Sequence, residues 1–233
     1  MLNDRNAMKN ELESPAEAYE LILDAIITQK LAPSQKVSEY ILAEMFDISR
    51  NMARSTIEQL ITQQFLVSIS PRVTRVAPLT LFAIKQNFTL RKMLEPTVFS
   101  MAAATADYRM LDKLHYDIKC TTPIKDDTTA LQFLKANKRS NLYLVEQARY
   151  PLLINWVNTL EDTAMRIYWL YTKLTHTYPF SPDHQKRLVE ALRKDDAREV
   201  HSQTLMILES CEERVMKAIF SHDQLNEQDL HVP

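Results

Sequence analysis

The most informative stretch of the chain is Asp47-Ile48-Ser49-Arg50-Asn51-Met52-Ala53-Arg54. Ser49 is a good N-cap, because its hydroxyl can accept a hydrogen bond from the first turn of a following helix. Arg50 and Arg54 are four residues apart and therefore share one face of that helix near its N-terminus, with Asn51 beside them. Such an arginine can bond bidentately to guanine or to phosphate, and a helix N-terminus itself favours phosphate. The segment has the character of a recognition helix.

The residues before and after this segment predict a helix-turn-helix. Helical patterns run over residues 38–46 and 49–63 with only Asp47-Ile48 between them, which is the tight joint of that motif. An earlier helix is expected to start at Ser14-Pro15-Ala16-Glu17, which combines a capping box with a proline at the first helical position. That helix should end before Pro33.

A wing and a local positive charge follow the recognition helix. Residues 65–69 and 73–76 are short β-like runs that flank Pro71-Arg72, and they predict a two-stranded hairpin. Residues 48–78 hold four arginines and one glutamate, whereas residues 1–47 hold four basic and nine acidic side chains. The net charge of the whole chain is −2, so any attraction for a polyanion must be local.

The rest of the chain shows only helical periodicity, from Thr80 to about Phe220. Ala77-Pro78-Leu79-Thr80 is expected to be a hinge, and Pro96 should kink or split the first long helix. The fold class expected is mainly α, with about six helices in this part. The segments expected are a flexible arm at 1–13, a winged helix-turn-helix at 14–78, an all-α bundle at 79–220, and a frayed tail at 221–233.

The absence of glycine excludes several classes of enzyme. The chain contains no glycine at all, so it has no phosphate-binding P-loop, no dinucleotide-binding GxGxxG turn and no GxSxG nucleophile elbow. No Glu-x-x-His pair suits a di-iron bundle, and no Ser/His/Asp or Cys/His set is apparent. An enzyme is therefore not expected. Positions that need a positive φ should be occupied by Asn, Asp or Lys, or avoided by longer connections.

The composition favours a cytoplasmic protein. No run of about 18 apolar residues is present to span a bilayer, and the polar start of the chain lacks the apolar core of a signal peptide. Cys120 and Cys211 lie far apart in the sequence, so neither a disulfide framework nor a zinc ribbon is expected.

The order of these elements resembles the GntR family of bacterial regulators, and the resemblance covers about residues 14–215. The N-terminal match lies in Ile22 to Leu31, Ala32-Pro33-Ser34-Gln35-Lys36-Val37-Ser38-Glu39, Leu42-Ala43-Glu44, Ile48-Ser49-Arg50 with Arg54, and Leu60 to Val67. Arg91-Lys92-Met93-Leu94-Glu95 is similar to the FadR-like subfamily, whose effector domain is a helical FCD bundle. The chain departs from the pattern where the family has glycine, at Ser34, at Phe65 and at the tip of the wing.

The resemblance implies a DNA-binding regulator, more often a repressor, that acts as a homodimer on a palindromic operator. Arg50 and Arg54 would contact bases or phosphates in the major groove. The DNA-contacting residues that the motif and the resemblance together indicate are Lys36, Tyr40, Ser49, Arg50, Asn51, Arg54, Arg72, Thr74 and Arg75.

FCD domains of this kind often hold a divalent metal with one Asp and three His. Asn137, Asn141, Gln185 and Ile207 occupy those four places here, and they are not the usual ligands of a transition metal. His184 and His201 lie near two of the places but out of helical register. No metal or other cofactor is therefore expected.

A small-molecule effector is still implied by the resemblance. Arg91 would bind the carboxylate of a carboxylic acid, and Asn137, Asn141 and Gln185 would hydrogen-bond to it. The alternative for Arg91 is an ion pair with Glu95 one turn later. The alternative for the whole protein is an interaction scaffold, in which the winged helix binds a protein partner and the effector site is degenerate.

Overall fold

The computed structural model describes residues 14–180, 182–222 and 229–230, without the side chains of residues 182–184. Residues 1–13, where we expected a flexible arm, lie outside the described part. The chain folds into two compact units that divide between Pro78 and Leu79. This division falls within residues 77–80, where the sequence predicts a hinge.

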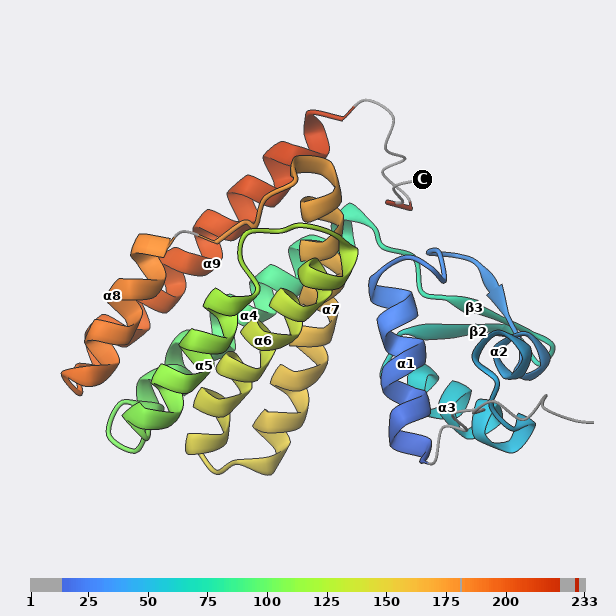
Figure 1. The fold of residues 1–233 in the computed structure, drawn as a ribbon, viewed down its shortest axis with the longest axis horizontal. Helices are drawn as coiled ribbons and strands as arrows, with labels where there is room; N and C mark the ends of the chain where they lie inside the picture. Colours follow the sequence, from blue (N-terminus) through green and yellow to red (C-terminus); the bar gives the residue numbers. More distant parts are fainter. Residues whose placement is uncertain (1–13, 181, 223–228, 231–233) are drawn as a thin grey trace, which may run out of the picture. The chain divides into compact units, whose positions relative to one another are not determined.

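From residue 14 onward, the N-terminal unit contains three helices and a small antiparallel sheet (Figure 1). Its elements are α1 (Pro15–Ile27), β1 (Lys36–Val37), α2 (Glu39–Phe46), α3 (Arg50–Thr62), β2 (Leu66–Ser70) and β3 (Val73–Val76). Ser14 and Glu17 form the predicted capping box at α1, and the hydroxyls of Ser38 and Ser49 cap α2 and α3. The predicted winged helix-turn-helix is confirmed.

The sheet has three strands rather than the two that the sequence predicts. Its order is β1-β3-β2, and Lys36 pairs with Arg75 while Leu66 pairs with Val76. The extra strand β1 has only two residues, which is too short for an alternating pattern to reveal. An irregularity between Ser68 and Ser70 precedes the turn at the tip of the wing.

The core of this unit joins the apolar faces of the three helices to the sheet. Ile22 and Ile26, four residues apart on α1, are fully buried with Leu42 of α2 and Leu60 of α3, and Phe65 closes the core at the start of the sheet. Burying one such side chain contributes about 1.5–3 kcal/mol relative to leaving it exposed. This packing holds the opposite face of α3 toward solvent.

Without glycine, seven other residues adopt a positive φ in the described part of the chain: Gln29, Ser34, Asp47, Gln64, Arg149, His176 and Asp195. The expectation of Asn, Asp or Lys is right only for Asp47 and Asp195. Ser34 takes the left-handed conformation at the position where the family has glycine. Phe65 occupies the second position where the family has glycine, but it is buried and does not adopt a positive φ. The preceding residue, Gln64, is the left-handed one.

The C-terminal unit is a helical bundle. In the described residues its elements are α4 (Leu81–Ala102), α5 (Tyr108–Cys120), α6 (Asp127–Gln147), α7 (Pro151–Thr175), α8 (Pro182–Arg193) and α9 (Ala197–Phe220). Thr80 caps α4, and Pro96 lies inside α4 without splitting it. None of the helices within the described residues combines the length and the hydropathy needed to cross a bilayer.

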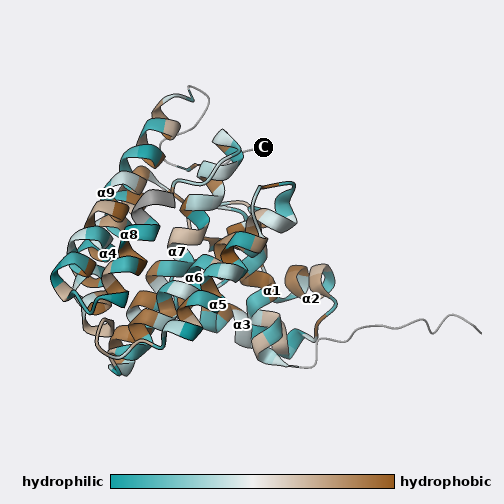
Figure 2. Ribbon diagram, turned by 60° about the vertical axis from the view of Figure 1, so that its left-hand side comes forward, coloured by the Kyte–Doolittle hydropathy of each residue, from teal (hydrophilic) through white to brown (hydrophobic). Residues whose placement is uncertain are grey.

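Helix α4 is central to the packing of the bundle. It packs against α6, α7 and α9, while α5 packs against α6 and α8 packs against α9 (Figure 1). The helices of the bundle carry both hydrophobic and hydrophilic residues, as expected when one face of a helix is buried (Figure 2). The core includes Phe99 of α4, Leu144 of α6 and Val157 of α7.

The expected frayed tail is wrong at Leu230. This side chain is fully buried, and its backbone N–H donates to the carbonyl oxygen of Leu79 at 2.7 Å. An apolar residue in a polar tail can return to the bundle and bury its surface there. The other expected tail residues, apart from 221–222 and Asp229, lie outside the described part.

Candidate nucleic-acid interface and effector cavity

The predicted recognition surface is exposed on α3. Arg50, Asn51 and Arg54 are exposed near the N-terminus of the helix, whereas Ala53 and Leu60 are fully buried on its other side. The hydroxyl oxygen of Ser49 accepts a hydrogen bond from Met52 N at 3.1 Å, so its role in the free protein is to cap the helix. The arrangement presents two arginines, an amide and a helix N-terminus to solvent.

Neighbouring side chains orient the two arginines. The guanidinium carbon of Arg50 lies 5.7 Å from the ring centroid of Tyr40, which is 59% exposed. Nε of Arg54 lies 3.4 Å from Glu58 Oε1 and 3.8 Å from Glu39 Oε1. Exposed pairs of this kind contribute only about 0–1 kcal/mol, so a phosphate or a base edge can replace these carboxylates.

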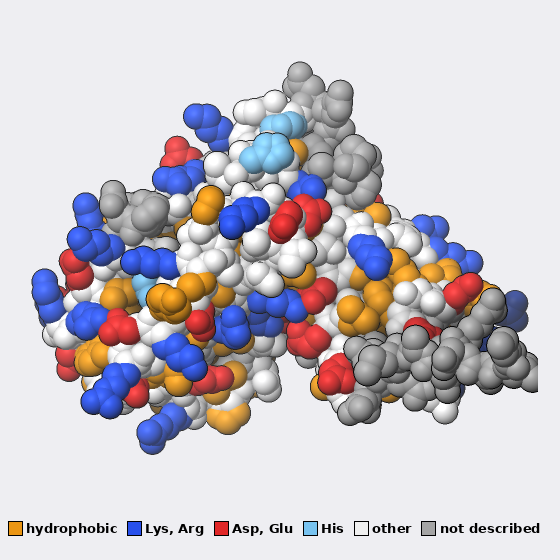
Figure 3. Space-filling model, in the orientation of Figure 1, with side chains coloured by type: hydrophobic (Ala, Val, Ile, Leu, Met, Phe, Trp, Pro, Cys, Tyr) orange, Lys and Arg blue, Asp and Glu red, His pale blue; other side chains and the backbone are white. Residues whose placement is uncertain are grey.

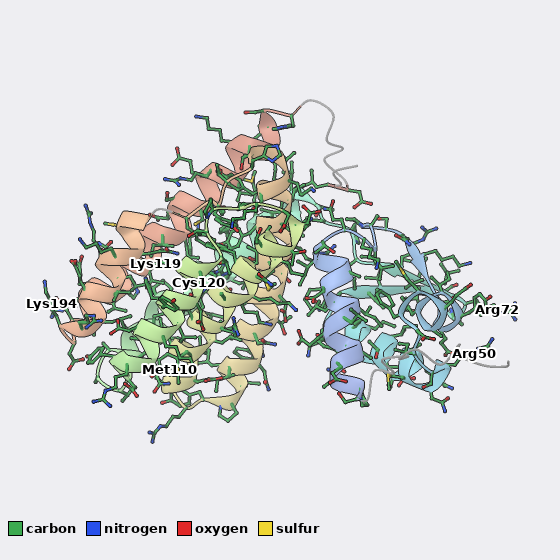
Figure 4. All side chains as sticks on the ribbon, viewed as in Figure 1. Arg50, Arg72, Met110, Lys119, Cys120 and Lys194 are labelled. Carbon is green, nitrogen blue, oxygen red and sulfur yellow. The ribbon has the colours of Figure 1, made fainter. Side chains whose placement is uncertain are left out.

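The residues of the wing and of β1 differ in how exposed they are and in whether other residues already bind them. Arg72 is exposed at the tip, and within the described chain its guanidinium has no ion-pair partner; Figure 4 shows Arg50 and Arg72 projecting from the same end of the unit. Lys36 is exposed on β1, and Thr74 is half-buried in β3. Nη1 of Arg75 donates to the carbonyl oxygen of Ser34 at 2.7 Å. Arg75 therefore also holds the left-handed loop in place.

The bundle encloses a group of polar residues, called here the Arg91 cluster: Arg91, Glu95, Asn141, Glu161 and Tyr168. All of them are buried except Asn141, which is half-buried. Nε of Arg91 donates to Glu95 Oε1 at 2.6 Å, and its Nη2 donates to Glu161 Oε1 at 2.7 Å and to Glu95 Oε2 at 3.1 Å. Its Nη1 donates to the Tyr168 hydroxyl at 2.7 Å. The Asn141 amide donates to Glu161 Oε1 at 2.9 Å.

The charges of the cluster are tightly coupled. Burial opposes the charge on Arg91, but Glu161 and Glu95 hold the pKa of Arg91 above its ordinary value. Burial and, to a smaller extent, the nearby Glu161 raise the pKa of Glu95 to about 8 despite the opposing effect of Arg91. A neutral Glu95 leaves Arg91 and Glu161 as a one-to-one ion pair. Arg91 therefore does contact Glu95 one turn later, as in the alternative expected from the sequence, but through hydrogen bonds to a protonated carboxyl, and Glu161 is its anionic partner. Arg91 offers no unpaired face to a carboxylate.

The residues predicted to bind the effector do meet around one cavity, called here the central cavity. Arg91, Asn137, Asn141, Gln185 and Ile207 all line it, but its volume is only about 50 Å³. A cavity of this size holds a few water molecules, whereas pockets for organic ligands measure about 300–1,000 Å³. An organic acid does not fit the central cavity as it stands.

The residues around the central cavity are not the usual ligands of a transition metal. The four positions that carry metal ligands in similar domains supply three amides and the alkyl chain of Ile207. His201 is exposed, and the side chain of His184 lies outside the described part. Across the residues that the structure describes, no three His, Cys, Asp or Glu side chains are grouped as metal ligands.

Sequence reasoning missed Glu161 and Tyr168, which complete the Arg91 cluster. Both come from α7, 70 and 77 residues after Arg91. The available signal was Glu161-Asp162 within a largely apolar helical stretch, because a buried carboxylate needs a cationic partner. That signal indicates a partner but does not identify it.

Comparison with known proteins supports this architecture. The family model described as FCD domain matches residues 86–210. The structure of E. coli McbR/YncC aligns with a TM-score of 0.72 at 14% identity, over 89% of this chain and 97% of that chain. A putative GntR transcriptional regulator from Rhodococcus sp. RHA1 aligns with a TM-score of 0.69 at 17% identity, over 88% of this chain and 98% of that chain.

A GntR family member from Pseudomonas syringae pv. tomato aligns with a TM-score of 0.51 at 19% identity, over 91% of this chain and 92% of that chain. No curated protein sequence matches the chain. The family match covers more than half of the chain, and the similar structures cover both of its units. The chain therefore belongs to the FCD domain family, and its fold is that of the GntR transcriptional regulators, which are not enzymes.

Proposed function

We propose that the N-terminal unit binds double-stranded DNA and that a small molecule bound in the helical unit changes this binding. The observation that carries the proposal is the exposed group of Arg50, Asn51 and Arg54 at the N-terminus of α3, with Arg72 at the same end of the unit (Figure 4). A recognition helix contacts base edges through its N-terminal residues, and a wing reaches the adjacent backbone. Lys36, Tyr40, Ser49, Thr74 and Arg75 are proposed as supporting contacts.

The active form is proposed to be a cytoplasmic homodimer on a palindromic operator, acting as a repressor. Support for the dimer comes from an exposed apolar stripe on α4, formed by Phe82, Leu90, Met93 and Met101. These side chains fall within about 100° of one another around the helix axis. Phe82 is 75% exposed and Met93 68%, and large apolar side chains exposed on one helix face favour association with another copy.

The effector domain is proposed to work without a metal, because amide and alkyl side chains occupy the family's ligand positions. A carboxylate bound directly by Arg91, which the resemblance suggested, finds little support in this geometry. Glu161 already neutralises that guanidinium, and Glu95 accepts two more of its hydrogen bonds. Asn137, Asn141 and Gln185 could still contact an effector if the central cavity opens.

DNA binding is tested by selecting duplexes from a random 30-base-pair pool and measuring affinity for the selected duplex by fluorescence anisotropy. With about four phosphate contacts, affinity should fall roughly a hundredfold between 50 and 200 mM salt. Failure to enrich any duplex, or binding that does not respond to salt, would favour the interaction scaffold with a degenerate effector site.

A further inference from the structure

The helical unit contains a second, larger cavity, called here the lateral cavity. It measures about 660 Å³ and lies among α5, α6, α8 and the segment that precedes α8. This volume falls within the range of pockets that hold organic ligands, about 300–1,000 Å³. The volume of the central cavity lies well below that range.

One wall of the lateral cavity is aromatic. Phe133 of α6 stacks on Tyr178 with ring centroids 3.4 Å apart, and Phe180 lies beside them with its centroid 5.8 Å from that of Phe133. Ile118 and Val189 extend the apolar lining. The hydroxyl oxygen of Tyr178 is buried and has no hydrogen-bond partner among the described residues.

The lining also carries an excess of positive charge. Lys119, Lys186 and Arg193 line the cavity, and Glu190 is the one acidic residue among the described lining residues. Lys186 lies 3.9 Å from Glu190, and Arg193 pairs with Asp112. Lys119 has no carboxylate partner in the described part of the chain. The face over α5 and α8 accordingly shows Lys and Arg side chains around hydrophobic patches (Figure 3).

We propose that the lateral cavity binds an amphipathic organic anion, with an aromatic or other apolar body against Phe133, Tyr178 and Phe180, and its anionic group at Lys119. The inference rests on the proposed function, because it names the ligand class and the binding place of the effector. A buried apolar body provides affinity, and a cation at the mouth of the cavity selects for negative charge.

The same cavity is connected to the Arg91 cluster. Phe180 and Gln185 line both the lateral and the central cavity. The Phe180 ring meets the Tyr168 ring edge-on with centroids 4.9 Å apart, and the Tyr168 hydroxyl accepts a hydrogen bond from Arg91. A ligand that moves Phe180 therefore acts on the buried ion pair between Arg91 and Glu161, which joins α4 to α7.

The test uses two fluorescent probes of the same shape, 8-anilinonaphthalene-1-sulfonate and uncharged N-phenyl-1-naphthylamine, on the full-length protein. We expect one saturable sulfonate site per chain. Lys119→Gln should weaken the sulfonate probe about threefold to tenfold and leave the uncharged probe unchanged. Lys194→Gln is the matched control, since this exposed lysine follows α8 outside the lining, and it should change neither probe (Figure 4).

Val189→Trp fills the apolar part of the cavity and should weaken both probes at least tenfold, with an unchanged circular dichroism spectrum as the check on folding. Equal effects of Lys119→Gln and Lys194→Gln, or unchanged binding in folded Val189→Trp, would overturn the proposal. The assay contains no DNA, so a negative result removes the lateral cavity as the effector site and leaves DNA binding to its own test.

Discussion

Arg91 and Glu161 form a buried ion pair between α4 and α7, with Nη2 of the arginine 2.7 Å from Oε1 of the glutamate. Their side chains are 2% and 1% exposed, so water has almost no access to the ion pair. A buried pair gains little over an apolar core of the same shape, but breaking it leaves an uncompensated charge. The Arg91 cluster therefore makes the packing of these two helices depend on a few polar contacts.

Removing the arginine should strongly destabilise the protein. Arg91→Met leaves Glu161 buried without its cationic partner, and we expect the free energy of unfolding to fall by about 3–5 kcal/mol. Urea denaturation followed by circular dichroism measures this loss. Lys186→Met is the control, because its ion pair with Glu190 is exposed and should matter by less than about 1 kcal/mol. Similar midpoints for the two variants would show that the Arg91 pair is not buried as described.

Glu95 should make stability depend on pH. Its pKa is raised from 4.5 to about 8 in the folded state, so the folded protein holds this proton more tightly than the unfolded chain does. The contribution of this carboxyl is complete below about pH 4.5 and is lost as the pH rises toward 8. Glu95→Gln keeps a neutral polar group and should remove that loss.

The measurement is the urea midpoint of wild type and Glu95→Gln at pH 5, 6.5 and 8. Comparing the two proteins cancels the other titrating groups, and the variant should gain stability relative to wild type as the pH rises. A constant difference between the two proteins across this range would mean that Glu95 does not take up a proton in the folded state.

The two cysteines should differ in reactivity. Both are free; Cys120 is exposed, whereas Cys211 is buried and burial raises the pKa of its thiol to about 12. A thiol titration at pH 8 should find one reactive group in the native protein and two in denaturant. Cys120→Ser should leave none in the native state. Two rapidly reacting thiols in the native protein would place Cys211 at the surface.

The left-handed residues offer a test of how the chain folds without glycine. Gln64 has φ of 63°, whereas the adjacent Gln63 has φ of −84°. Gln64→Gly relieves the left-handed conformation and should stabilise the protein by about 0.5–1 kcal/mol. Gln63→Gly only adds chain entropy in the unfolded state and should destabilise it. Thermal unfolding of the pair measures both, and a loss of stability in Gln64→Gly would argue against the assigned backbone.

Local signals in the sequence were enough to predict the winged helix-turn-helix. Ser14, Ser38 and Ser49 mark helix starts, and the apolar spacing of α1 and α3 shows which faces are buried. Strand β1 could not be predicted in this way, because two residues carry no period and its pairing with β3 spans a long stretch of chain. The left-handed position at Gln64 likewise depends on how α3 leads into β2.

The effector region was less predictable because it depends on distant contacts. The spacing of Arg91 and Glu95 indicates a pair on one helix, but Glu161 approaches them only once α7 packs on α4. The resemblance correctly predicted that Asn137, Asn141 and Gln185 lie around one cavity. The small size of this cavity depends on how the side chains pack, which the resemblance does not indicate. The lateral cavity has no sequence motif, since its walls come from separate helices and a loop.

The central claim is that the N-terminal unit binds DNA through α3, and a titration of Arg50→Ala against a selected duplex tests it most directly. Arg109→Ala truncates an exposed arginine of α5 and serves as the control. Fluorescence anisotropy should show that Arg50→Ala weakens binding by about 1–3 kcal/mol, or roughly fivefold to more than a hundredfold, while Arg109→Ala binds like wild type. Equal affinity of wild type, Arg50→Ala and Arg109→Ala would contradict the assignment of α3 as the recognition helix.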